Sequence, residues 1–559
     1  MNALVLLLIG FACLIAGYVV YGSWLEKQWG VDPNRETPAH TMYDGVDYVP
    51  AKAPVLLGHH FSSIAGAGPI NGPIQAAIFG WLPCLLWILI GGIFFGAAHD
   101  YGSLVASVRH KGESIGEVIA QNIGTRAKRL FIIFAYLALL LVIAAFASIV
   151  AGTFNGFDAN GNTIEANGST ATISILFILM AIVFGFCVYR KNYSLSVCTV
   201  VGVIALVLCI AAGLAFPVYL PGHTWMYIIG LYIMIASVTP VWILLQPRDY
   251  LSSFLLYAMM IAAVVGVFAC HPTLSLPAFV GFETHGQYLF PALFVTIACG
   301  AISGFHSLIA SGTTSKQLSS EKDAKLIGYG AMLIECALAI VSLIAISYIY
   351  SESGDAAFKI PPTAVFASGI SKMLAAVGLD SPEAQKTTYG LMILAVSAFC
   401  LTSLDTAARM SRYLFTEFWL NPGETVDSVT GFRKVLCNKY VGTFISVVLG
   451  VGFGLGGWAK VWPLFGASNQ LLAGLALLAI AAWLKNASRN HKMLVFPMAF
   501  MILVTLTSLF LTFIGKIQTI SAGQGDLTAA YLQAGLSAIL FVLALFLVRE
   551  ALPVLRKKA

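Results

Sequence analysis

The chain contains 559 residues, of which 59% are hydrophobic and 10% are charged, and its mean hydropathy is +0.87. This composition excludes a soluble multidomain protein and predicts a polytopic membrane protein. The formal net charge of +6 indicates no nucleic-acid partner, because Lys and Arg fall in the loops between apolar segments, where they report orientation.

Apolar runs of about 18 to 25 residues, long enough to cross a bilayer core, recur along the whole chain. Runs of this length must be helices, since a lipid-facing backbone satisfies its own hydrogen bonds and a barrel strand has only about ten residues. We therefore predict an all-α bundle of about fifteen transmembrane helices, two of them broken. The predicted segments are residues 2–24, 54–79 (broken), 82–108, 130–152, 172–189, 195–217, 224–246, 251–270, 288–314 (broken), 327–350, 387–408, 436–453, 459–484, 493–515 and 528–549.

The basic residues of the loops alternate along the chain. Residues 109–129 contain five Lys or Arg, whereas 153–170 contain none, and the alternation continues to the C-terminus. The long loop predicted at 351–386 is the exception, because it carries three Lys on the wrong side. The positive-inside rule predicts an N-terminus outside the cell and a C-terminus in the cytoplasm.

The second predicted segment contains GHHFSSIAGAGPINGP, from Gly58 to Pro73, whose glycines and prolines prevent a continuous helix. A second break lies in CGAISGFHSLIASGTTSKQ, from Cys299 to Gln317. The two segments are seven spans apart and therefore cross in opposite directions. Broken helices paired in this way are typical of inverted-repeat transporters with a site near the midplane. The alternative is that the glycines only allow close helix packing.

The two breaks are expected to surround a small anionic or zwitterionic substrate, whose carboxylate is held by free N–H groups at a half-helix N-terminus. Gly66→Leu or Gly304→Leu is expected to abolish binding while the folded protein stays in the membrane. The candidate substrate-binding residues are Ser62, Ser63, Ala65, Gly66, Gly68, Asn71, Ser303, Gly304, His306 and Ser307.

Ionisable residues within the spans are candidates for ion coupling, because a charge in lipid is costly and normally faces the bundle interior. Asp100 lies in the third segment, Glu335 in the tenth and Asp405 in the eleventh. The alternatives are structural: a hydrogen bond to free backbone for Asp100, and an i, i+4 ion pair with Arg409 for Asp405.

Three histidines, His59, His60 and His99, are a less favoured metal site, since adjacent histidines point in different directions on a helix. No other cofactor is predicted. Arg248 and Asp249 fall in a predicted cytoplasmic turn and are interpreted as gate or loop-fixing residues.

Five stretches of this sequence together resemble the carbon starvation protein A (CstA) family, over residues 1–480. They are GHHFSSIAGAGPINGPIQAAIFGWLP, GGIFFGAAHDYGSLVASVRHKGESIGEV, PVWILLQPRDYLSSF, ACGAISGFHSLIASGTTSKQL and LTSLDTAARMSRY. The resemblance implies a multi-pass inner-membrane secondary transporter of the amino acid–polyamine–organocation (APC) superfamily, with peptides or pyruvate as substrates.

The resemblance also implies a LeuT-like inverted-repeat fold, in which the first and sixth core helices are broken. The eleventh span then takes the role of the eighth core helix, which often supplies hydroxyls to a sodium site. This adds Thr402, Ser403 and Thr406, beside Asp405, as ion-coupling candidates. The implied organisation is an N-terminal helix and cytoplasmic loop at 1–53, a transport core at 54–485, and two peripheral helices with a basic tail at 486–559.

A proton is favoured over sodium as the coupling ion. Asp100, His306, Glu335 and Asp405 are four titratable candidates, whereas hydroxyls and a carboxylate form one oxygen cluster for sodium. Pyruvate–proton symport is also a possibility that the family resemblance implies.

The sequence predicts a secondary active symporter that imports small carboxylate-bearing nutrients. An enzyme is not expected, because no loop exceeds about 40 residues or carries a catalytic arrangement. The alternative is a transporter-like receptor that binds the substrate without net transport. The expected partners are the substrate and the lipid bilayer, and the sequence fixes no oligomeric state.

Overall fold

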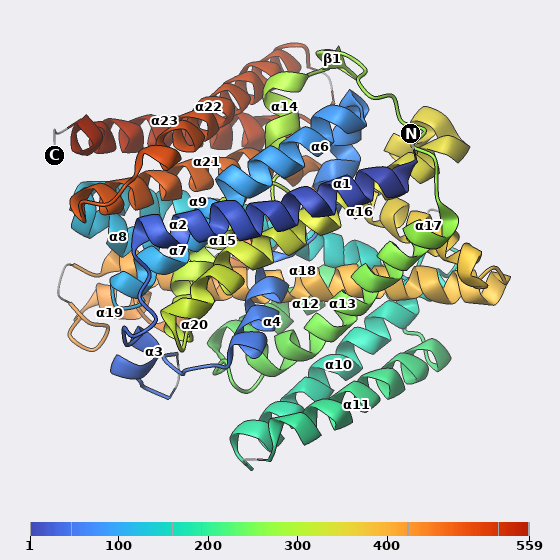
Figure 1. Cartoon of the computed structure of the whole chain (residues 1–559), viewed down its shortest axis with the longest axis horizontal. Helices are drawn as coiled ribbons and strands as arrows, with labels where there is room; N and C mark the ends of the chain where they lie inside the picture. The colour runs from blue at the N-terminus through green and yellow to red at the C-terminus, as the bar shows by residue number, and fades with distance from the viewer. Residues whose placement is uncertain are drawn as a thin grey trace.

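The computed structural model describes residues 2–45, 47–158, 160–191, 193–421, 424–523 and 525–556. The predicted basic tail begins at Arg556, and its remaining residues, 557–559, lie outside the described residues. The described chain is an assembly of helices (Figure 1), and its named strands are one short antiparallel pair, β1 (Glu283–Thr284) and β2 (Gln287–Tyr288).

Eleven helical segments of the described residues are long and apolar enough to cross a membrane. Several consist of consecutive helices joined without a turn. The elements that form these segments are α1 (Ala3–Ala16), η1 (Gly17–Gly22) and α2 (Ser23–Trp29); α6 (Trp81–Ile90), η3 (Gly91–Gly96) and α7 (Ala97–Arg109); α9 (Thr125–Phe154); α10 (Glu165–Tyr189); α11 (Leu195–Ala215); α13 (Leu245–Cys270); η5 (Glu321–Asp323), η6 (Lys325–Gly330), α16 (Ala331–Ser353) and η7 (Gly354–Lys359); α18 (Pro382–Trp419); α21 (Trp458–Asn486); α22 (Lys492–Ser521); and α23 (Leu527–Arg556).

Shorter helices complete the bundle. Each of the fifteen predicted segments coincides with helical structure, and the four outside the eleven are α12, α20 and the two interrupted helices. That these four also cross the bilayer stays a prediction. The shorter elements are α3 (Pro38–Thr41), α4 (Ala53–Ile64), α5 (Gly68–Ala76), η2 (Ala77–Phe79), α8 (Ile115–Asn122), α12 (Gly222–Val238), α14 (Leu289–Thr296), α15 (Gly304–Gly312), η4 (Thr314–Lys316), α17 (Pro362–Leu374), η8 (Ala375–Val377), α19 (Phe432–Leu436) and α20 (Lys439–Gly454).

The predicted loop at 351–386 is wrong in one respect, because it contains the helix α17. Pro362 occupies the first helical turn, where its missing N–H costs no hydrogen bond. Val365, Phe366 and Ile370 are spaced along one face of α17 and are fully buried. These apolar side chains drive the segment into the bundle.

The arrangement of the helices has a buried centre and two apolar edges. The apolar parts of α18 and α21 are buried almost throughout. The α10–α11 pair and the α22–α23 pair lie at opposite edges of the bundle (Figure 1). On α11, Val197, Val200 and Leu208 are exposed, as expected of a face that contacts lipid.

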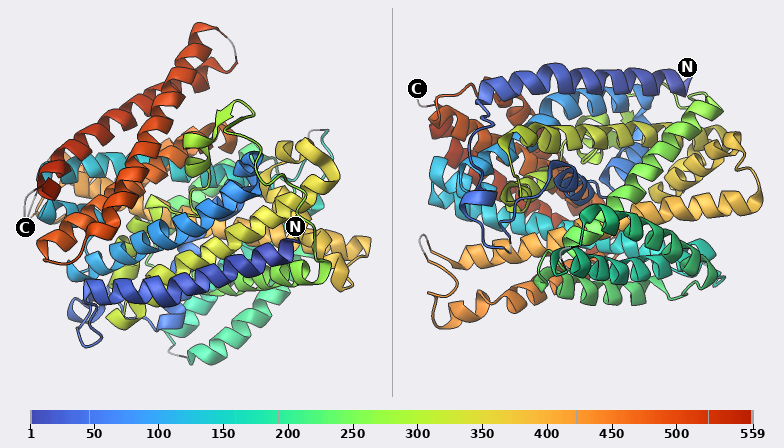
Figure 2. Two further views of the ribbon diagram at one scale, coloured as in Figure 1. Left: turned by 45° about the horizontal axis from the view of Figure 1, so that its top comes forward. Right: turned by 60° about the horizontal axis from the view of Figure 1, so that its bottom comes forward.

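The two ends of the described chain lie at opposite ends of the bundle (Figure 2). The first turn of α1 is at one end, and the last turn of α23 is at the other. This arrangement agrees with termini on opposite sides of a membrane. Which of the two sides is the cytoplasm stays a prediction from the loop charges.

Candidate functional site

Both predicted helix interruptions are present. The first lies between α4 and α5 at residues 65–67. Pro69, in the first turn of α5, lacks the N–H group that a continuous helix would need there. The second lies between α14 and α15 at residues 297–303. Each interruption therefore leaves backbone polar groups inside the bundle that other parts of the protein, or a ligand, must satisfy.

The two interruptions are in contact. A Cβ atom on Gly68 would lie 2.5 Å from the Cβ and Sγ atoms of Cys299, and one on Gly72 would lie 2.6 Å from the carbonyl oxygen of Thr296. Only glycine permits such an approach at these positions. The expectation that the breaks lie side by side is therefore confirmed.

Beside the interruptions lies a buried group of titratable side chains, which we call the Asp100 cluster: His99, Asp100, His306 and Glu335. Oδ2 of Asp100 lies 2.7 Å from Nδ1 of His306, and Oδ1 lies 2.7 Å from Nδ1 of His99. Nε2 of His306 lies 3.4 Å from Oε2 of Glu335, without the geometry of a hydrogen bond. All four side chains are fully buried. Helices α7, α15 and α16 thus bring together residues that are more than 200 positions apart.

The Asp100 cluster lacks a fixed positive charge. No Lys or Arg of the described chain forms an ion pair with it, and neither carboxyl oxygen of Glu335 has a hydrogen-bond partner there. Two buried carboxylates with no permanent counter-charge are unfavourable in a low-dielectric interior. Protons bound within the cluster are the means by which it loses this excess charge.

The unwound segment of the second interruption is held by Asn469 of α21, a residue that the sequence reasoning missed. Its Oδ1 accepts a hydrogen bond from the Phe305 backbone N–H at 2.8 Å, and its Nδ2 donates to Oγ of Ser303 at 3.1 Å. Asn469 therefore accepts a hydrogen bond from one of the N–H groups that have no intrahelical partner at the N-terminus of α15. The polar run Ser468–Gln470 inside an otherwise apolar span was the signal that could have found it.

The remaining candidate substrate residues are buried around the interruptions. Oγ of Ser403 on α18 donates to the carbonyl oxygen of Ser63 at 3.0 Å, and Oγ of Ser62 donates to the carbonyl oxygen of Asp249 at 3.2 Å. Oγ of Ser63 and Oδ1 of Asn71 have no partner in the described chain. Unpartnered buried polar atoms are candidates for ligand contact, and their role stays a prediction.

The less favoured metal trio, His59, His60 and His99, is not among the groups of metal-ligating side chains whose donor atoms lie close together in the described chain. Each of the three histidines has a different hydrogen-bond partner, all through Nδ1. The partners of His59, His60 and His99 are Asp249 at 3.0 Å, Thr314 at 2.8 Å and Asp100 at 2.7 Å, respectively. The histidines lie on different helices or point in different directions, as adjacent positions on one helix must.

A different set of donor atoms lies close together. The ligand atoms of Cys299, His306 and Glu335 are all within 4.8 Å of one another, and the described chain offers no other such group. The short distances between these three ligand atoms would allow them to hold a metal ion. Their first two members also contact Ser303 and Asp100, so the group belongs to the hydrogen-bonded interior already described.

A second buried network joins four helices, and we call it the Arg248 network: His59, Tyr232, Arg248, Asp249 and Asp405. Arg248 binds Oδ2 of Asp405 and lies 2.9 Å from Oδ1 of Asp249. Nδ1 of His59 lies 3.0 Å from Oδ2 of Asp249, and the Tyr232 hydroxyl donates to Asp405 at 2.7 Å. The network connects α4, α12, α13 and α18.

One expectation about this network and one of the structural alternatives are wrong. Arg248 and Asp249 are not in a loop but are the fourth and fifth residues of α13, at 2% and 0% exposure. Pro247 fits there because the first turn of a helix leaves its N–H groups without intrahelical partners. Asp405 is paired with Arg248 instead of Arg409, whose guanidinium donates to the carbonyl oxygens of α12 and its C-cap.

Removing the positive charge of Arg248 is expected to destabilise the fold. Arg248→Gln would leave Asp249 and Asp405 buried without a counter-charge, and breaking a buried pair in this way costs on the order of 3 kcal/mol. The melting temperature of the detergent-solubilised variant should fall accordingly. The control is Arg190→Gln. Arg190 is exposed, and it lies over the ring of Trp242 without forming an ion pair in the described chain. Equal melting of both variants would contradict the structural role.

Comparison with known proteins places the chain in a family. The sequence model of the family described as "Carbon starvation protein CstA" matches residues 2–365 and 351–508. The peptide transporter CstA of Escherichia coli K12 is 30% identical, over 99% of this chain and 91% of the relative. The peptide transporter CstA of Bacillus subtilis 168 is 32% identical, over 90% of this chain and 89% of the relative.

Two further similarities have different names. The pyruvate/proton symporter BtsT of E. coli K12 is 32% identical, over 85% of this chain and 76% of the relative. A crystal structure of the Eremococcus coleocola manganese transporter matches with a TM-score of 0.49 and 11% identity, over 92% of this chain and 99% of that one. Since the family model covers most of the sequence and curated relatives align over nearly all of it, the chain belongs to the carbon starvation protein CstA family.

Proposed function

We propose that this chain is a secondary active symporter that imports peptides or pyruvate by alternating access coupled to protons. The observation that carries the proposal is the contact between two interrupted helices beside the buried Asp100 cluster. Relatives named as a peptide transporter and as a pyruvate/proton symporter support the same class of function.

The architecture proposed for this function is a LeuT-like inverted repeat of the APC superfamily. Residues 54–485 would form the transport core, flanked by residues 1–53 and 486–559. The substrate would bind where the interruptions meet, at the ten residues predicted from the sequence. The buried, unpartnered oxygens of Ser63 and Asn71 support this position. The cell inner membrane, with the N-terminus outside, is the proposed setting.

The Asp100 cluster is proposed to carry the coupling proton. His306 lies between the two carboxyl groups, with Nδ1 facing Asp100 and Nε2 facing Glu335. An imidazole in this position accepts a proton on one nitrogen and releases another from the second. It relays a proton between the two carboxyl groups when the contact between Nε2 and Glu335 closes to a hydrogen bond.

Coupling follows from the helices that carry these groups. His306 is on α15, which is half of an interrupted helix, whereas Asp100 and Glu335 are on α7 and α16. Gain or loss of a proton changes the attraction between α15 and these neighbours. Such a change favours one arrangement of the interrupted helix over another, as a symporter requires.

Sodium is the less favoured coupling ion. Asp405, the carboxylate of the predicted oxygen cluster, is bound by Arg248 and Tyr232. The hydroxyls of Thr402 and Ser403 donate to the carbonyl oxygens of Ala398 and Ser63. These hydroxyls keep their lone pairs, but a hard cation at this place would also need a carboxylate, and the guanidinium of Arg248 already neutralises Asp405.

Counterflow in proteoliposomes tests whether the protein transports. Vesicles loaded with unlabelled pyruvate or tripeptide are expected to accumulate the labelled compound transiently, because a carrier exchanges substrate across the membrane. A receptor that only binds would show saturable binding and no counterflow, and this result would exclude the proposed transport. Vesicles without protein provide the background.

A further inference from the structure

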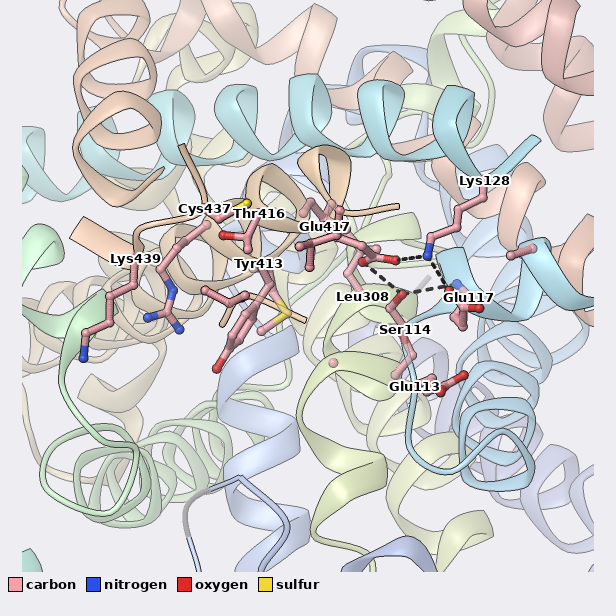
Figure 3. A pocket seen from close by; sticks show the side chains of 18 of the residues that line it. Glu113, Ser114, Glu117, Lys128, Leu308, Tyr413, Thr416, Glu417, Cys437 and Lys439 are labelled. Carbon is pink, nitrogen blue, oxygen red and sulfur yellow. Dashed lines mark hydrogen bonds and ion pairs between the residues drawn. The ribbon is translucent and has the colours of Figure 1, made fainter. Parts of the chain in front are cut away.

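A large cavity lies at the end of the bundle where α7 and α18 end, the end that the loop charges assign to the cytoplasm (Figure 3). Its volume is about 910 Å³, within the range of small-molecule sites. Leu308, Ser311 and Gly312 of α15 line it together with Met410 of α18. The cavity therefore reaches the second half of the interrupted helix α14–α15.

One side of the cavity is basic. Its cations are Lys316, Arg412 and Lys439, and none forms an ion pair within 4 Å in the described chain. Nζ of Lys316 lies 5.6 Å from the ring centre of Tyr413, and Cζ of Arg412 lies 4.4 Å from it. The hydroxyl of the same tyrosine is 3.5 Å from Asp47. Two cations thus gather around one aromatic ring with a single carboxylate nearby, and the third, Lys439, lies 5.2 Å from the ring centre of the neighbouring Tyr440.

Arg412 is the informative member of this side. It is only 6% exposed, and its Nε has no hydrogen-bond partner in the described chain. A buried guanidinium with an unused donor is costly unless an anion or water completes its hydrogen bonding. The side chain lines the cavity, so a ligand in the cavity is within its reach.

The other side of the cavity is acidic. It carries Glu113, Glu117 and Glu417, and the only ammonium among them is Lys128, which binds Glu117 and lies 3.0 Å from Glu417. Burial, and then the neighbouring Glu117, raises the pKa of Glu113. Ser114 donates to Glu417 at 3.4 Å. The acidic side therefore has three carboxylates for one fixed cation.

The two kinds of charge are separated across the cavity. In Figure 3, Glu113, Glu117 and Lys128 lie together on one side, whereas Tyr413 and Lys439 lie on the other. Glu424 does not add to either side, because its hydrogen bond with Arg433 lowers the pKa of Glu424 to about 2 and neutralises the pair. A ligand that fits this distribution carries a cation at one end and an anion at the other.

We propose that this cavity is a second binding subsite, which holds the ammonium end of a short, unblocked peptide against Glu113, Glu117 and Glu417 and its carboxylate end against Lys316, Arg412 and Lys439. Pyruvate has no cationic end and only three carbon atoms, so it uses one side of the cavity alone. The interpretation of the subsite as a station on the release route rests on the proposed function, whereas the binding itself does not.

Calorimetric titration of the purified full chain tests the subsite with four probes: triglycine, N-acetyltriglycine, triglycine amide and pyruvate. Triglycine should bind at least tenfold more tightly than either blocked peptide. Glu113→Gln should weaken triglycine about tenfold and leave N-acetyltriglycine unchanged, because that ligand has no ammonium group. Lys316→Gln should weaken triglycine and leave triglycine amide unchanged.

The matched controls are Asp427→Asn and Lys434→Gln, two exposed positions near the same end of the bundle that do not line the cavity. Melting temperatures of all variants identify any that are misfolded, and the two cavity variants test opposite sides independently. Wild-type affinity for triglycine in both cavity variants would overturn the proposal, as would equal binding of the blocked peptides. Absence of counterflow would instead contradict the proposed transport and leave these binding results standing.

Discussion

Gly304→Ala is expected to prevent stable folding, because the added methyl group has no space between α15 and α21. The added Cβ would lie 2.3 Å from the backbone nitrogen of Ala473 and from the carbonyl oxygen of Asn469. Neither atom belongs to a side chain that could rotate away. Separating α15 from α21 would also disturb the hydrogen bond that Asn469 accepts from Phe305, so we expect a loss of about 3 kcal/mol or more.

The melting temperature and the fraction of monodisperse protein after size-exclusion chromatography measure this effect. The matched control is Gly452→Ala on α20, where an added Cβ meets no atom within 4 Å. The melting temperature of this variant is expected to match that of the wild type, since alanine has a higher helix propensity than glycine. Should both variants melt at the wild-type temperature, the close packing of α15 on α21 would be contradicted. Position 304 has no room for a side chain. Gly304→Leu is therefore expected to disrupt the fold, and not to leave a folded protein that only fails to bind.

Glu335→Gln is expected to abolish proton-driven accumulation while substrate exchange continues. The amide is close in shape to the carboxyl group, and the carboxyl oxygens of Glu335 make no hydrogen bond that the change would break within the described chain. However, an amide does not exchange protons with His306. Uptake driven by an imposed pH gradient should fall at least tenfold, whereas counterflow, which needs no gradient, should persist.

The control for this prediction is Glu352→Gln, on the same helix α16 but exposed and paired with Lys372. All buffers contain a chelator, so that a metal bound near Cys299 does not contribute to the result. Gradient-driven accumulation by Glu335→Gln at the wild-type level would remove this residue from the coupling mechanism.

Hydropathy and residue type located the helices because each span is set by a local property, the length of an apolar run. The interruptions were also predictable, since proline and glycine act through the local backbone at positions such as Gly68 and Pro69. What brings Asp100 beside His306 is the packing of helices distant in sequence. Because Asp100 and His306 lie inside apolar spans, the sequence indicated that both side chains face the interior. It did not indicate which groups they contact there.

The Arg248 network shows more clearly what a sequence does not predict. A proline beside two charges is typical of a loop, and the sequence offered no local sign that Asp405 would pair with Arg248, or that His59 would contact Asp249, inside the bundle. Pairing of buried charges depends on tertiary distances, which no single segment encodes. The same reason explains why an i, i+4 partner, Arg409, was the natural but incorrect structural choice for Asp405.

The central claim is that proton binding in the Asp100 cluster drives import through the site between the interrupted helices. The most direct test follows the internal pH of sodium-free proteoliposomes with a trapped dye, while labelled pyruvate or triglycine is added outside at lower pH. We predict substrate uptake together with internal acidification that requires the substrate, and the loss of both gradient-driven signals in Glu335→Gln. Uptake that requires sodium and leaves the internal pH unchanged would contradict the account.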